Sequence, residues 1–274
     1  MTDALNEEAI EPHKQELIEQ AATLYAVQKV YGDQAKAKSM AVYGRLIDAH
    51  LLVTGVLASG LLRINGTVVE GERTAFERDA LFAAFVIGMA PCETAIAEAR
   101  YLQAHAMLRQ ELEILAQLKA VRANRRKLNG APNIAALEQS LARLYGGLSA
   151  AAHVSQHDVV QSATEWDGEM DGLPGPTNLT RYFPETDEGL ARRSYALHIY
   201  MVVRLIEELS IDLATRYDNA RFTENETEAL GLAIDLMVAE GMLELVDPSL
   251  REMQTSAGPT GGKSASGCWL DQHM

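Results

Sequence analysis

The spacing of apolar residues constrains this chain most, because apolar positions recur every three or four residues along almost all of its 274 residues. Hardly any stretch shows the strict alternation expected of a half-buried β-strand. Between Leu17 and Tyr31, for example, the apolar side chains would share one face of a helix. We therefore predict an all-α protein, a helical bundle of six to eight helices.

Two long helical segments are expected to form the spine of this bundle as a hairpin. They run from about Gln34 to Ile64 and from Thr74 to about Leu128. Pro91 lies within the second segment and is expected to kink or break it, because proline lacks a backbone amide hydrogen. Gly32-Asp33 is expected to end an earlier helix that starts at Pro12.

Capping boxes predict where two of the helices begin. In the patterns Thr74–Glu77 and Thr223–Glu226, a hydroxyl and a carboxylate would each satisfy a free backbone amide at a helix start. Asn133 is expected to cap a further helix that carries Leu141, Leu144 and Leu148 on its apolar face.

We divide the chain into four parts. Residues 1–165 are expected to form an N-terminal helical bundle, and residues 166–186 an irregular connection rich in proline and glycine. Residues 187–253 should supply C-terminal helices that pack on the same bundle. Residues 254–274 have the low-complexity composition of a disordered tail.

The composition favours a cytoplasmic protein. Only two cysteines occur, Cys92 and Cys268, which excludes a disulfide scaffold and fits a reducing compartment. The acidic N-terminus has no apolar segment typical of a signal peptide. The uncharged segments 51–62 and 80–92 are shorter than the ~20 residues of a membrane-spanning helix, so we expect buried helices and no membrane.

The net charge of −14 argues against general binding of nucleic acid, because phosphates would be repelled. One local exception is the segment 119–127, which contains five cations and no acid. This segment is a candidate surface for an anion, RNA or an acidic partner. Alternatively, its cations complement the dipole at a helix C-terminus, since Asn129-Gly130 follows closely. The candidate binding residues here are Lys119, Arg122, Arg125 and Arg126.

A second candidate binding site is the histidine face Ser149, His153 and His157. If the helix after Asn133 continued this far, these three residues would lie one turn apart on one side of it. Two histidines at this spacing can share a metal ion when another chain segment supplies a further ligand. The alternative is a polar helix face with small neighbours. The segment lacks the HExxH glutamate that metalloprotease chemistry requires.

The same segment carries a short resemblance. Tyr145, Leu148, Ser149, His153 and Ser155 match a Y-x-x-L-S-x-x-x-H-x-S pattern that is similar to one in poorly characterised bacterial helical proteins. The resemblance covers about a dozen residues. It implies an all-helical fold and some role for Ser149 and His153, and it implies no activity.

A third pattern, R-x4-H, resembles the motif of HEPN-type helical ribonucleases. Arg193 and His198 have this spacing, and the pattern recurs at Arg45–His50 and at Arg100–His105. In such enzymes arginine stabilises charge on a phosphate while histidine transfers a proton. The resemblance implies that Arg193 and His198 would be catalytic and would face a second copy across a dimer. Three occurrences in one chain show that the pattern is permissive.

The acidic residues of the long second segment raise the question of a carboxylate-bridged metal pair. They are Glu93, Glu98, Glu111 and Glu113. Ferritin-like di-iron bundles use Glu-x-x-His on two helices, and no glutamate of this chain precedes a histidine by three positions. The sequence also has no phosphate-binding glycine loop, nucleophile elbow or zinc-type cysteine spacing. We therefore expect no metal and no cofactor.

These absences favour a binding or scaffold module over an enzyme. A homodimer is expected, because small residues at Gly55, Ser59, Gly60 and in the 146–152 segment would allow helices to approach closely. A protein partner is possible, and RNA is disfavoured by the net charge. The alternatives are a HEPN-like ribonuclease or toxin, and a metal-binding helical protein that uses His153 and His157.

Overall fold

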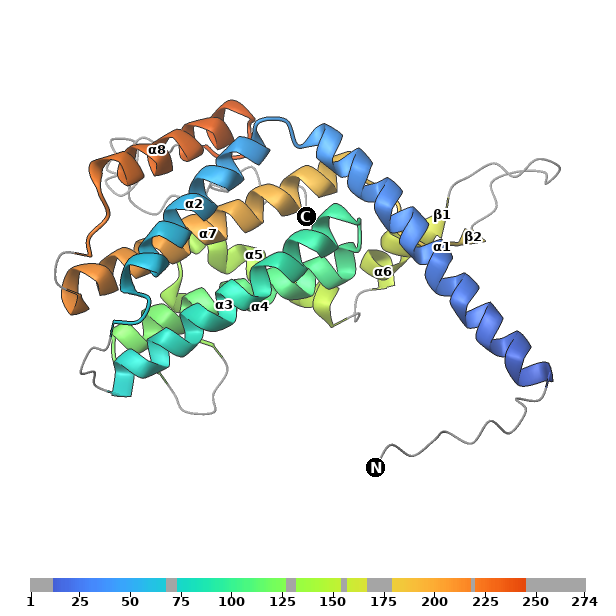
Figure 1. Ribbon diagram of the computed structural model, residues 1–274, viewed down its shortest axis with the longest axis horizontal. Helices are drawn as coiled ribbons and strands as arrows, with labels where there is room; N and C mark the ends of the chain where they lie inside the picture. Colours follow the sequence, from blue (N-terminus) through green and yellow to red (C-terminus); the bar gives the residue numbers. More distant parts are fainter. Residues whose placement is uncertain are drawn as a thin grey trace, which may run out of the picture.

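The protein is an all-α helical bundle, as the sequence predicted (Figure 1). The computed structural model describes residues 12–67, 73–126, 132–153, 157–166, 179–217 and 220–244. In these ranges the helices are α1 (Pro12–Val42), α2 (Leu46–Ile64), α3 (Arg73–Ala97), α4 (Tyr101–Arg122), α5 (Gln139–Ala152), α6 (His157–Thr164), α7 (Glu188–Arg216) and α8 (Glu224–Ala239), with one 3-10 turn at Ile134–Ala136.

The long helix α7 is the centre of the bundle. It packs against α2, α3 and α4, while α8 covers α2 and α5 covers α4 (Figure 1). Sixteen of its side chains are buried, and most of these are apolar. Burial of this apolar surface is the main force that holds the other helices around α7.

Within the two segments that were expected to form the spine, the helices begin and end at other residues than predicted. α1 continues through Gly32-Asp33 and ends at Val42, and the chain then turns at Gly44, whose φ of +55° suits glycine. Gly32 is buried where α1 meets the rest of the protein, and a Cβ there would lie 3.4 Å from the Glu98 carboxylate, an ordinary van der Waals distance. This glycine lies inside α1 and does not end the helix.

The second segment consists of two helices, but Pro91 does not separate them. α3 runs through Pro91, and the chain turns at Glu98–Arg100, where Ala99 has a φ of +56°. Asn124 also has a positive φ of +52°, and α4 ends shortly before it at Arg122. Residues 127–131, where the sequence predicted the helix end, lie outside the described residues.

The two capping-box predictions have different outcomes. At Thr223 both reciprocal hydrogen bonds with Glu226 are present, so the start of α8 is confirmed. Thr74 lies inside α3, which already includes Arg73, so the other prediction places the helix start too late. Asn133 makes no side-chain cap; a 3-10 turn follows it, and α5 starts only at Gln139.

The connection before α7 contains a small amount of strand. β1 (Glu165–Trp166) pairs antiparallel with β2 (Leu179–Thr180), with Glu165 opposite Thr180. The predicted disordered tail lies outside the described residues.

Two helices, α2 and α3, are long and apolar enough to cross a membrane. The core helices of soluble proteins also meet this criterion. In this fold 28% of the apolar window of α2 and 39% of that of α3 is buried inside the protein.

Candidate metal centre

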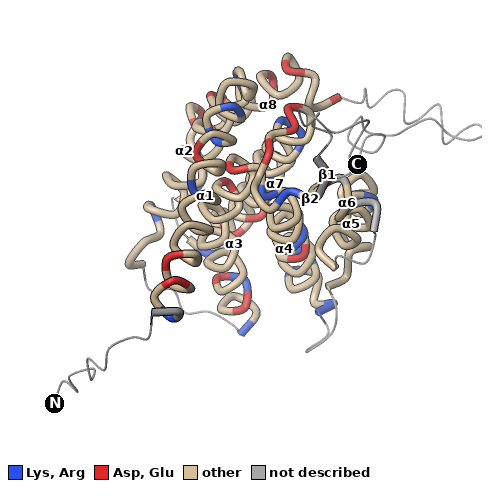
Figure 2. Tube along the Cα trace, turned by 90° about the vertical axis from the view of Figure 1, so that its right-hand side faces the viewer, with Lys and Arg blue, Asp and Glu red and all other residues tan. Residues whose placement is uncertain are grey.

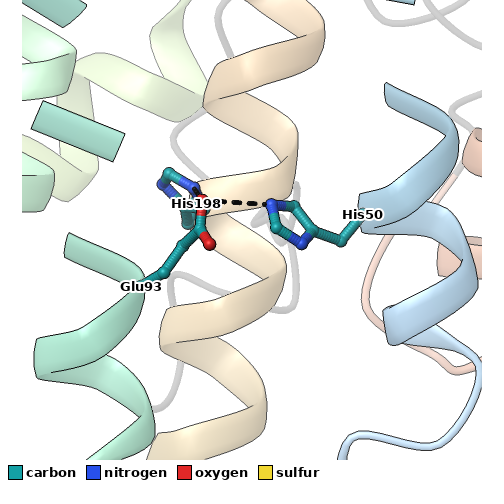
Figure 3. A group of neighbouring side chains, drawn as sticks. All are labelled: His50, Glu93 and His198. Atoms are coloured by element: carbon teal, nitrogen blue, oxygen red, sulfur yellow. Dashed lines mark hydrogen bonds and ion pairs between the residues drawn. The ribbon is translucent and has the colours of Figure 1, made fainter. Parts of the chain in front are cut away.

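Four helices each bring polar side chains to one point in the core. α2 supplies His50, α3 supplies Cys92 and Glu93, α4 supplies Glu111, and α7 supplies His198. In Figure 3 the Glu93 carboxylate lies between the two imidazole rings, which approach it from α2 and α7. We refer to these five residues as the core cluster.

The distances in the core cluster are those of a compact ligand set. Glu93 Oε1 lies 3.3 Å from His50 Nε2 and 3.4 Å from His198 Nε2. The three ligand atoms all lie within 4.8 Å of one another. Ligands bound tetrahedrally at 2.0–2.1 Å from one metal ion stand about 3.3 Å apart. The two distances to Glu93 therefore match those expected around a single ion.

The other nitrogen of His198 faces a second carboxylate. His198 Nδ1 lies 2.9 Å and 3.1 Å from the two oxygens of Glu111. Metal-bound histidines commonly donate their second N–H to a carboxylate, which fixes the orientation of the ring. Glu111 is therefore placed to orient His198 while Nε2 faces His50 and Glu93.

Burial is graded across the core cluster. His198, Cys92 and Glu111 are buried, whereas the side chain of His50 is 12% exposed and that of Glu93 is 32% exposed. Water or a small molecule can therefore approach the cluster from the side of Glu93, while the opposite side is closed by the core.

The electrostatics follow from this arrangement. Burial alone would lower the pKa of His198, but the charge of Glu111 and hydrogen bonds with Cys92, Glu111 and Glu93 raise it well above its usual value. Burial opposes ionisation of Glu93, but the hydrogen bond with His198 and the close approach of the His50 imidazole nevertheless lower the pKa of Glu93 to about 2. Burial raises the pKa of the Cys92 thiol to about 11, so Cys92 stays protonated.

His50 contributes an incompletely satisfied polar atom. Its Nε2 is buried, and although Glu93 Oε1 is 3.3 Å away, the direction of approach does not make a hydrogen bond. Eight other buried side-chain atoms of the described residues also lack a hydrogen bond, but only this one lies beside a second imidazole and a carboxylate, where a metal ion would satisfy it. The His50 ring instead packs edge-on against Tyr195, with ring centroids 5.3 Å apart.

The sequence indicates this site through polar residues at apolar helix positions, although no sequence motif indicates it. His50, Glu111 and His198 each lie within a helical stripe of buried residues, so each is a polar residue at a core position. The sequence predicts no metal at Glu93 and Glu111, because the Glu-x-x-His motif is missing. Their histidine partners come from other helices, at distances in sequence that no local motif records.

Two histidines of the R-x4-H pattern, His50 and His198, belong to the core cluster, but the arginines of the pattern do not. The rings of His50 and His198 lie 5.7 Å apart, but Arg45 contacts Glu240 through its backbone. His198 is completely buried within one chain, whereas the ribonuclease hypothesis requires it to face a second copy.

Two of the remaining residues of this pattern lie near each other elsewhere. Burial, and to a smaller extent the charge of the nearby Arg193, lowers the pKa of His105. The third arginine, Arg100, pairs with Glu98 at 2.8 Å.

The predicted histidine face does not form as one helical surface. α5 ends at Ala152, and His153 caps it, whereas His157 begins the separate helix α6. His153 Nε2 lies 2.9 Å from a guanidinium nitrogen of Arg109, which also bonds Glu113. Ser149 lies within α5, at a half-buried position. The metal-ligand groups formed by the described side chains include neither Ser149 nor His153, and the side chain of His157 lies outside the described residues.

The basic segment lines a cavity of about 520 Å³ at the C-terminal end of α4, with Lys119, Arg122 and Arg125 in its wall. Acidic side chains lie close to several of its cations, as expected from the mixture of signs over the bundle in Figure 2. Arg122 pairs with Glu208 at 3.2 Å, Arg126 with Glu77 at 3.0 Å, and Lys119 lies 3.5 Å from Glu138. Because these cations already have acidic partners within the protein, the ion pairs favour a role of the segment in stabilising the helix end over a role as a binding surface.

Comparisons with known protein families, with characterised proteins and with solved structures find no match to this chain. Its function is therefore argued from the core cluster alone.

Proposed function

We propose that this chain is a metal-binding helical protein that holds one divalent transition-metal ion through His50, Glu93 and His198. The observation that carries the proposal is the set of three ligand atoms from three helices within 4.8 Å of one another. This departs from our sequence-based expectations of no metal and of a site at His153 and His157.

The charge of the core cluster favours a divalent ion. Glu93 and Glu111 bring two negative charges next to buried imidazoles, and a proton on His198 supplies only one positive charge. A divalent cation bound by neutral imidazoles would balance both carboxylates. Buried charge is costly unless it is compensated, so this balance supports occupancy by such an ion.

The ligand types narrow the choice of metal. Two imidazoles and one carboxylate suit Zn²⁺ and Fe²⁺ better than Mg²⁺ or Ca²⁺, which prefer oxygen ligands. Three protein ligands leave at least one coordination position for water or a substrate. An ion bound there would act as a Lewis acid on that molecule, and the partial exposure of Glu93 provides a route to it.

Metal titration of the purified full-length chain tests the proposal. After treatment with a chelator, the wild type should bind one equivalent of Zn²⁺ or Co²⁺, and Co²⁺ should give visible absorption bands that report nitrogen and oxygen ligands. His50→Ala and Glu93→Gln should remove these bands. Both residues lie on the more accessible side of the cluster, so these variants should still fold, and circular dichroism checks this.

His153→Ala is the matched control and should bind metal like the wild type. Failure of the wild type to bind either ion, or equal binding by folded His50→Ala, would overturn the proposal. A loss of binding in His153→Ala with retention in His50→Ala would instead favour the histidine pair predicted from the sequence.

A further inference from the structure

The N-terminal half of α1 carries an apolar face that the described part of the chain leaves uncovered. α1 is 31 residues long, and it extends well past the bundle (Figure 1). Its main contacts with the other helices are with α3 and α7, and its buried residues among those described are Gly32, Ala35 and Ser39, all in the second half. The first half is exposed throughout from Lys14 to Val27.

The uncovered face is a direct continuation of the buried one. At 100° per residue, Leu17, Ala21, Leu24 and Gln28 lie on the same side of α1 as Gly32, Ala35 and Ser39. Leu17 is 61% exposed, Leu24 is 50% exposed and Tyr25, which flanks them, is 71% exposed. We call the face formed by Leu17, Ala21, Leu24 and Gln28 the seam. Its residues are separated by four, three and four positions, which is the spacing of a coiled coil.

We propose that α1 of one chain pairs with α1 of a second copy, antiparallel, along the seam Leu17–Gln28. This inference does not depend on the metal proposal. It also replaces the dimer surface predicted from small residues. One of those residues, Gly60, packs inside its own chain, where a Cβ would lie 2.9 Å from the ring of Phe222.

The distribution of charge along α1 favours a second copy in the antiparallel sense. Residues 12–26 contain Glu16 and Glu19 with one lysine, whereas residues 27–42 contain three lysines and one aspartate. An antiparallel pair therefore places the acidic half of each helix beside the basic half of the other. A parallel pair would place like charges together and would align the two helix dipoles unfavourably.

The position of the bundle leads to the same orientation. From Gly32 onward the seam side of α1 is covered by its own chain. In a parallel pair both bundles would lie at the same end and compete for the space between the helices. In an antiparallel pair they lie at opposite ends, and the free seams meet in the middle.

Coiled-coil packing fixes which residues meet. In an antiparallel arrangement Leu24 packs against the partner's Ala21, and Leu17 against the partner's Gln28. The two Leu24 residues are then separated along the axis by about 4–5 Å and the two Leu17 residues by about 16 Å. In a parallel pair the two Leu24 residues would lie at the same height along the axis, and so would the two Leu17 residues.

Cysteine cross-linking of the full chain tests the orientation, in a Cys268→Ser background that retains the buried Cys92. Under mild oxidation Leu24→Cys should form a disulfide-linked dimer and Leu17→Cys should not. Equal cross-linking at both positions would overturn the antiparallel arrangement.

Light scattering during size exclusion tests the pairing itself. The wild type should have twice the monomer mass of 29.9 kDa, and the double substitution Leu17→Lys and Leu24→Lys should give the monomer. Val30→Lys is the matched control, because Val30 is 52% exposed on the opposite side of α1, and it should leave the dimer intact. A wild type that stays monomeric at high concentration, or that binds phospholipid vesicles through Leu17 and Leu24 as a monomer, would overturn the proposal.

Discussion

Two buried polar clusters lie along α7, and they differ in how completely their charges are satisfied. In the core cluster, His198 faces Glu111 and Glu93, and the Nε2 of His50 lacks a hydrogen bond. Nearer the C-terminus of α7, Arg78 of α3 meets Glu208 and Asp212. We call the second set the arginine cluster.

In the arginine cluster every charge has a partner of opposite sign. Arg78 donates to both oxygens of Asp212 at 2.9 Å and 3.0 Å, to Glu208, and to the backbone carbonyls of Leu118 and Glu208. Three arginines, Arg78, Arg122 and Arg216, pair with the three acids Glu208, Asp212 and Asp79. Its charges balance without any added ion.

The comparison shows how a buried network that stabilises the fold, the arginine cluster, differs from a candidate metal site, the core cluster. Both clusters are buried and both contain carboxylates from α7 or its neighbours, so burial alone distinguishes nothing. The difference lies in the excess negative charge of the core cluster, because a buried nitrogen without a hydrogen bond occurs in both sets, as His50 Nε2 in one and Arg216 Nε in the other. The following predictions test this distinction, from the largest expected effect to the smallest.

Replacing Arg78 with Met should destabilise the protein by about 3–5 kcal/mol, because Glu208 and Asp212 would remain buried without their main partner. Denaturant unfolding measures the free energy. Arg73→Met is the control on the same helix, and because Arg73 is 77% exposed its ion pair should contribute less than about 1 kcal/mol. Added Zn²⁺ should leave the difference between Arg78→Met and the wild type unchanged; rescue by metal would contradict the separation of the two clusters.

His105 is a half-buried histidine whose Nε2 is buried without a hydrogen bond among the described residues, and it should behave in the opposite way to His198. Burial, with a smaller contribution from the charge of Arg193, lowers the pKa of His105 to about 4. As the pH falls from 6.5 to about 4, the unfolded state therefore takes up a proton that the folded state does not, and stability decreases. The loss should be about 3 kcal/mol.

The variant His105→Gln isolates this contribution from the other acid-sensitive groups. Its stability, measured by denaturant unfolding across the same pH window, should fall about 3 kcal/mol less than that of the wild type. Parallel curves for the two proteins would show that His105 is not held neutral by the fold.

Glu111→Gln should weaken metal binding about 10–100-fold, because the amide orients His198 less strongly than the carboxylate. Competition titration with Zn²⁺ measures the affinity. Glu113→Gln, two positions along α4, is the control, since Glu113 bonds Arg109 and Tyr145 away from the core cluster. Equal affinities for the two variants would remove Glu111 from the metal site.

His153→Ala should change stability by less than about 0.5 kcal/mol, because its contact with Arg109 is at an exposed position. Thermal unfolding in the presence and absence of Zn²⁺ provides the measurement. A metal-dependent shift that is smaller than that of the wild type would mean that the ion binds at the predicted histidine face after all.

The sequence by itself determined the all-α class, because the period of its apolar residues allows an amphipathic helix and no regular strand. It also determined local features whose interactions span only a few residues, such as the capping box at Thr223 and Glu226. It placed the turns less well. Gly32 and Pro91 usually interrupt helices, and in this chain both lie inside one.

Only the tertiary structure shows the core cluster and which half of α1 is exposed. His50, Glu93, Glu111 and His198 come from four helices and are up to 148 positions apart, so only the packing of α2, α3 and α4 around α7 brings them together. In the sequence the apolar stripe of α1 is indistinguishable from a core-facing stripe, and only the position of the bundle shows that the described residues leave half of it uncovered. A repeating pattern shows that a face is apolar, but what covers that face depends on contacts between residues far apart in the chain.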